Sequence, residues 1–128
     1  MMLAHLRLQA AKILATAREA TLSASGPAGI QAQVFPCEAQ HLTLYFLVPV
    51  VSDLLQNLEH DPAVVVSTAG WQLKGNGRIL PVADAPTQLK LTQKPEASGC
   101  VLVEIRPSRL QINRRNSWGL SDTIDLDP

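Results

Sequence analysis

The run LTLYFLV at positions 42–48 is apolar on both sides of an extended chain. Side chains of a strand alternate between its two faces, so a strand of this composition has to be covered on both. The run is far shorter than the roughly 20 residues that a membrane-spanning helix needs, and no other apolar run reaches that length. It therefore predicts a central, deeply buried strand and a fold that supplies cover on either side.

Further short segments with strand character surround this run. ATLSAS (20–25) and IQAQVF (30–35) alternate with period two around the turn residues GPAG (26–29), which predicts a β-hairpin. In its second strand the apolar side chains lie on one face and the two glutamines on the other, namely Ile30, Ala32 and Val34 opposite Gln31 and Gln33. The next residues, PCEAQH (36–41), are predicted to be a polar loop.

The second half of the chain predicts more strands at 63–69, 71–80 and 100–107. Gly75 and Gly77 interrupt the second of these, where a bulge or sharp curvature is expected. Residues 109–113 either continue the last strand beyond Pro107 or begin another. For residues 84–99 a short strand and a helix remain equally open, and the tail from 114 to 128 has few core residues.

Two helices complete the prediction. Apolar residues recur at helical spacing over 3–18, which predicts an amphipathic helix within an N-terminal segment, 1–19. Ser52 is expected to cap a helix of about two turns that ends before Asp61-Pro62. Six or seven short strands without a repeated βαβ rhythm predict one mainly β (α+β) domain over 1–128, a closed or half-closed antiparallel barrel with short flanking helices.

Composition excludes several classes of function. The 11 Lys and Arg residues balance 11 Asp and Glu residues, so no net field attracts nucleic acid or an acidic membrane surface. The two cysteines and three histidines lack the spacing of a metal site or a disulfide framework, which favours a reducing cytoplasm and no bound metal. No spacing aligns a nucleophile, a base and an orienting acid, so catalytic residues stay unassigned.

Four stretches occur in a characteristic order: SGPAG (25–29), LYFLVPVVSDLLQNLEHDP (44–62), WQLKGNGRIL (71–80) and VEIRPSRLQI (103–112). In this order they resemble the pyridoxamine 5′-phosphate oxidase-like family of FMN-binding split barrels, over nearly the whole chain. The resemblance implies a six-stranded antiparallel split β-barrel that pairs into a homodimer. It also implies FMN in the groove between the two subunits, and an oxidoreductase of unassigned substrate.

The same resemblance places the family's phosphate-binding residues on this chain. The family's serine is kept as Ser52, but its threonine corresponds to Val48, and its basic residues correspond to Asp53, Leu54 and Gln31. Each hydrogen bond to a charged partner contributes about 1.5 to 3 kcal/mol, so the loss of three basic partners removes roughly 4 to 9 kcal/mol. The fold is expected to be kept while its phosphate clamp is dismantled.

The candidate cofactor-binding residues are Gln31, Gln33, Val48, Ser52, Lys74 and Trp118. Two hypotheses follow. In a flavoprotein, some basic residue has to point into the groove near Ser52, and the glutamines or Trp118 would contact the ring. In a cofactor-free homodimer that binds another small ligand, or serves a structural or regulatory role, Val48 and Leu54 would close that place with apolar side chains.

Overall fold

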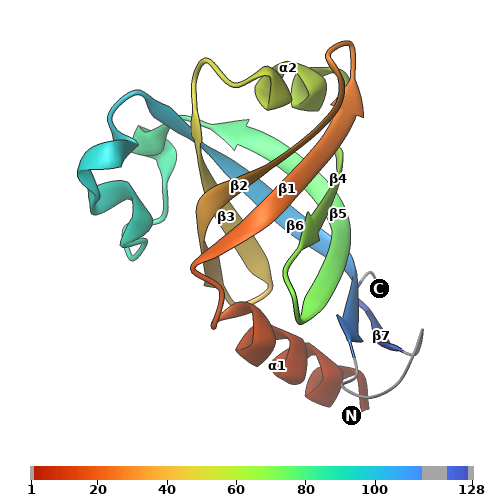
Figure 1. Cartoon of the computed structure of the whole chain (residues 1–128). Coiled ribbons are helices and arrows are strands. Elements are labelled where there is room, and N and C mark those ends of the chain that lie inside the picture. The colour runs from red at the N-terminus through yellow and green to blue at the C-terminus, as the bar shows by residue number, and fades with distance from the viewer. Residues whose placement is uncertain (1, 114–120, 127–128) are drawn as a thin grey trace.

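The computed structural model describes residues 2–113 and 121–126. Its centre is an antiparallel barrel of six strands, with a seventh strand outside it (Figure 1). The strands are β1 (Glu19–Gly26), β2 (Gly29–Gln40), β3 (Thr43–Pro49), β4 (Ala63–Ser67), β5 (Trp71–Leu80), β6 (Cys100–Asn113) and β7 (Ser121–Asp125). Their order is β3-β2-β1-β4-β5-β6-β7, and pairing of β3 with β6 closes the barrel. The predicted mainly β fold, a six-stranded antiparallel barrel with short flanking helices, is confirmed.

Strand β3 is buried on both faces, as its composition predicts. Leu44, Phe46 and Val48 belong to the main core cluster inside the barrel, where none of them is exposed to solvent. Tyr45 and Leu47 point outward and are covered by the segment that follows β5. This segment contains three short 3-10 helices, η1 (Val82–Asp84), η2 (Leu91–Gln93) and η3 (Pro95–Ala97). The open choice for 84–99 is thus resolved: these residues form neither a strand nor an α-helix, and they cover the outside of the barrel.

The first helix, α1 (Met2–Leu14), ends four residues earlier than the expected 3–18. After Leu14 the chain tightens into a turn in which the Thr16 hydroxyl donates a hydrogen bond to the carbonyl of Ile13 at 2.7 Å. A threonine side chain that bonds to the backbone in this way competes with continuation of the helix. Strand β4 likewise stops at Ser67, because the Thr68 hydroxyl accepts hydrogen bonds from the backbone N–H groups of Gly70 and Trp71, both at 3.2 Å.

The predicted loop at 36–41 is wrong, because β2 continues through it to Gln40. The second half of β2 pairs with β3, with Cys37 opposite Phe46, and Cys37 is buried in the core. The turn falls instead at 41–42, where His41 adopts a positive φ of 52°. Strand β6 also continues past Pro107, which lies opposite Gly75 at a register shift between Lys74 and Gly75. The extra residue at this shift is Ser108, so the irregularity lies at Gly75 as expected, but the bulge is in β6 and not in β5.

Helix α2 (Asp53–His60) begins and ends as predicted. Ser52 is its N-cap, with the side-chain Oγ accepting a hydrogen bond from the backbone N–H of Leu54 at 3.3 Å. Asn57 on this helix is completely buried and binds the turn between β1 and β2. Helix α2 therefore lies across the end of the barrel at which the hairpin turns (Figure 1).

No helix in the described part of the chain has both the length and the apolar composition needed to cross a membrane.

Candidate functional site

The turn before helix α2, where the resemblance places the phosphate of FMN, borders a hollow of about 380 Å³. Its lining includes Ser52, the carboxylate side chains of Asp53 and Glu59, and apolar residues of β5 and β6. Among the described residues that line it, none is a lysine or an arginine. The Ser52 oxygen already accepts a hydrogen bond from Leu54. In a single chain this hollow thus presents negative charge to an entering phosphate.

Val48 and Leu54, which the resemblance places at polar or basic positions of the family's phosphate clamp, are 0% and 1% exposed. Both belong to the main core cluster of the barrel. Their side chains close the region beneath the turn with apolar groups, the arrangement expected for a protein without a phosphate clamp at this place. A ligand at Ser52 would meet the helix N-terminus and Asp53, with no cation from the described part of the same chain lining the hollow.

A second hollow of about 500 Å³ lies where strands β1 and β4 separate. These strands pair only as far as Ser23 opposite Val65, after which their ends diverge. The walls are largely apolar, with Ile30 from β2 among them, and Lys74 of β5 lies beside the register shift between β5 and β6. Polar groups are few and come from short side chains of β1, β5 and β6, namely Ser23, Ser25, Asn76 and Ser108.

Of the residues predicted to contact a cofactor, only Lys74 lines this larger hollow, and only Ser52 lines the hollow beside α2. The Gln31 amide is half-buried and donates to the carbonyl of Ala28 in its own hairpin at 3.1 Å, while Gln33 is exposed. Val48 is enclosed in the core. Trp118 lies outside the described residues. The structure therefore does not gather the predicted set into one site.

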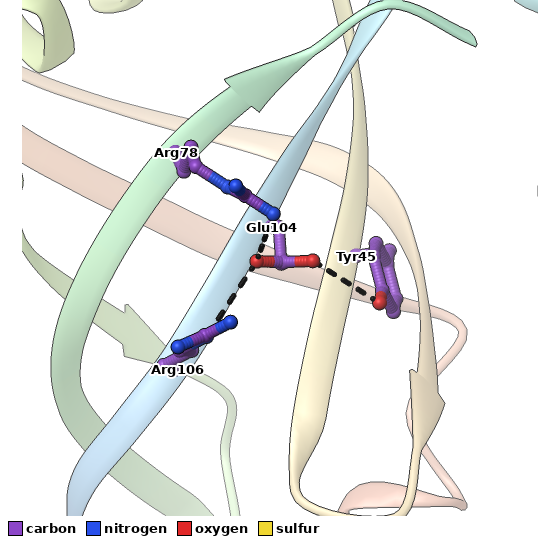
Figure 2. A network of polar contacts seen from close by, with 4 residues as sticks. All are labelled: Tyr45, Arg78, Glu104 and Arg106. Carbon is purple, nitrogen blue, oxygen red and sulfur yellow. Dashed lines mark hydrogen bonds and ion pairs between the residues drawn. The ribbon is translucent and has the colours of Figure 1, made fainter. Parts of the chain in front are cut away.

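A polar network on the outer face of β3, β5 and β6 was not foreseen from the sequence (Figure 2). Its centre is Glu104, which is 8% exposed and uses both carboxylate oxygens. Oε1 accepts from Nη2 of Arg78 at 3.1 Å and lies 3.6 Å from Nε of Arg106, while Oε2 accepts from the Tyr45 hydroxyl at 3.3 Å. Burial, and then the negative charge of Glu104, raise the pKa of Tyr45, so the phenol stays a hydrogen-bond donor.

The two cysteines do not form an activated nucleophile. Cys37 is 3% exposed, and burial followed by the charge of Glu19 raises the pKa of its thiol to about 12. Burial and the charge of Glu96 raise the pKa of the Cys100 thiol as well. A reactive thiol needs a lowered pKa, so neither group is suited to nucleophilic catalysis.

With this geometry established, comparison with solved structures identifies the class of fold. The chain is similar to general stress protein 26 from Bacillus anthracis str. Sterne, with 16% identity, a TM-score of 0.71, and coverage of 95% of this chain and 99% of that one. A putative pyridoxamine 5′-phosphate oxidase from Listeria innocua matches with 17% identity, a TM-score of 0.64, and coverage of 88% and 99%. A FAD-binding protein from Mesorhizobium loti matches with 14% identity, a TM-score of 0.58, and coverage of 80% and 90%.

No family model and no curated protein matches the sequence itself. At these identities the structural likeness establishes the fold. This protein is a split β-barrel of the type found in proteins named as pyridoxamine 5′-phosphate oxidases and flavin-binding proteins, as the sequence resemblance predicted.

Proposed function

We propose that this protein is a homodimer that binds a small, largely apolar molecule in the hollow between β1, β4 and β5, and that it does not hold an FMN phosphate at Ser52. The observation that carries the proposal is the hollow itself. Its volume of about 500 Å³ and its apolar walls with a few polar groups are typical of small-molecule sites. The hollow beside Ser52 has instead two carboxylates and no described cation.

Exposed apolar side chains beside the hollow support the homodimer. Ile30 is 83% exposed and Val34 is 55% exposed, and both lie on the same face of β2 because strand side chains alternate. Ile30 also lines the hollow. A second copy of the chain that covers this face would bury these side chains and enclose the ligand. In a two-fold dimer each copy would contribute the same surface, so two equivalent sites would result.

A flavin-type cofactor is a second candidate for the same hollow. The similarity to a protein named as FAD-binding favours it. A flavin bound here would pack its planar ring against the apolar walls, and Lys74 would contact one of the flavin's polar groups. It would not depend on a phosphate clamp at Ser52. An oxidoreductase activity would then be supplied by the cofactor, while the protein contributes binding and orientation.

The experiment compares Ile30→Asp with a matched control, Val51→Asp. Val51 is 86% exposed and is not among the residues that line the larger hollow, so both variants place a charge at an exposed apolar position. Light scattering measures the oligomeric state, and a titration with the fluorescent apolar dye N-phenyl-1-naphthylamine measures occupation of the hollow. We expect a dimer that binds the dye for the natural sequence and for Val51→Asp, and a monomer with weaker dye binding for Ile30→Asp. A monomeric natural protein, or equal dye binding by both variants, would overturn the proposal.

A further inference from the structure

We propose that the ligand of the larger hollow carries an anionic group, a carboxylate, sulfonate or phosphate, which is held by Arg78 and Arg106 on the outer face of β5 and β6. This inference rests on the proposed function, because it extends that site along the same strands. The two arginines line a smaller hollow of about 180 Å³ together with Asn76, Gly77 and Glu104. Asn76 lines both hollows, so the two adjoin.

The arginines have donors left over for a ligand. Each guanidinium carries five N–H groups, yet Glu104 is their one ion-pair partner in the described part of the chain. The side chains of Arg78 and Arg106 are 63% and 77% exposed, whereas that of Glu104 is 10% exposed. The carboxylate lies between the two guanidiniums (Figure 2), which stay largely exposed to solvent.

The charge of the cluster also favours an anion. Two guanidiniums face one carboxylate, so the cluster keeps a net charge of about plus one at neutral pH. The Tyr45 hydroxyl donates to the second oxygen of Glu104 at 3.3 Å, which holds the carboxylate in this orientation. The role of Glu104 is to position the arginines. A planar, forked guanidinium matches the geometry of a carboxylate or phosphate better than a lysine does.

The two hollows together define the shape of the ligand. Lys74, Asn76 and Arg78 alternate with glycines along β5 and therefore project from the same outer face. At about 3.3 Å per residue, Arg78 lies roughly 7 Å along the strand from Asn76, which borders both hollows. The ligand class that fits has an apolar body in the larger hollow and an anionic group close to that body, on the side of Arg78.

Two dyes that share an apolar body separate this inference from the proposed function. 1-Anilinonaphthalene-8-sulfonate carries a sulfonate that N-phenyl-1-naphthylamine lacks, and fluorescence titrations at fixed ionic strength give the affinity of each. We expect the sulfonate dye to bind at least about tenfold more tightly than the neutral dye, because one charge-assisted hydrogen bond contributes about that factor to affinity. The double variant Arg78→Gln/Arg106→Gln should remove this preference and leave the affinity for the neutral dye unchanged.

Arg109→Gln is the matched control, since Arg109 is an exposed arginine of β6 that pairs with Asp125 and does not line the smaller hollow. It should keep the preference for the sulfonate dye. If the neutral dye binds and the natural protein shows no such preference, or if the double variant keeps the preference, the inference is wrong while the proposed function stands. If neither dye binds, the proposed function fails and the inference fails with it.

Discussion

Replacement of Asn57 by alanine should destabilise the protein strongly, because this side chain joins helix α2 to the β1–β2 hairpin. Its Oδ1 accepts from the backbone N–H of Ala28 at 3.0 Å, and its Nδ2 donates to the carbonyls of Gly29 at 2.9 Å and Ala24 at 3.2 Å. The side chain is fully buried, so its removal leaves these backbone groups without their partner inside the protein. At about 1 kcal/mol net for each hydrogen bond, the three bonds together contribute about 3 kcal/mol.

Urea denaturation followed by circular dichroism measures this loss as a change in the free energy of unfolding. Gln56→Ala is the control, because Gln56 is exposed on the same helix and its substitution should change stability by less than about 0.5 kcal/mol. Asn57→Asp keeps the acceptor for Ala28 and loses both donors, so it should also destabilise. If Asn57→Ala costs less than about 1 kcal/mol, the idea that this side chain fixes the hairpin is refuted.

Two further predictions concern the backbone and the buried thiol. A methyl group at Gly75 would lie 2.5 Å from the carbonyl oxygen of Arg106, so Gly75→Ala should clearly lower the midpoint of thermal unfolding. Gly70→Ala is the control, because a methyl group there meets nothing within 4 Å and should leave the midpoint nearly unchanged. In a Cys100→Ser variant, Cys37 is the cysteine that remains. Its thiol should react with a thiol reagent at pH 8 only as fast as the protein unfolds, because burial raises its pKa to about 12. Fast reaction in the folded state would contradict the burial of Cys37. In the unfolded chain this thiol loses its proton near the ordinary cysteine pKa of 9.0, whereas the folded protein retains the proton, so stability should fall as the pH rises from about 9 toward 12.

Local sequence patterns were enough to predict most of the barrel. The apolar run of β3, the serine cap of α2 and the hairpin of β1 and β2 each depend on residues close in sequence. The error at 36–41 arose because its proline and polar residues are typical of a loop, whereas residues 37–40 pair with residues 43–46 of β3 in a tight hairpin. Glu38 is typical of a loop, but in the structure its carboxylate accepts hydrogen bonds from the backbone N–H groups of Lys90 and Leu91, 52 and 53 residues away.

The candidate site was predicted less well, because its residues come together across long separations in the sequence. Ser52 and Lys74 belong to recognisable local motifs, and each lines a hollow. The larger hollow exists because β1 and β4 separate after a few pairs, which only the register of the sheet reveals. Glu104 is separated in the sequence by 59 residues from Tyr45 and by 26 residues from Arg78, so no local sequence motif predicts this network.

The absorbance spectrum of the purified protein tests the central claim most directly, because the claim is a split barrel without an FMN phosphate clamp. It should be recorded as isolated, and again after incubation with excess FMN and removal of unbound FMN by gel filtration. Asp53→Arg, which restores a cation at the exposed start of α2, serves as the companion variant. The account predicts a colourless natural protein in both samples and more retained flavin in Asp53→Arg. FMN retained by the natural protein and lost on Ser52→Ala would contradict it.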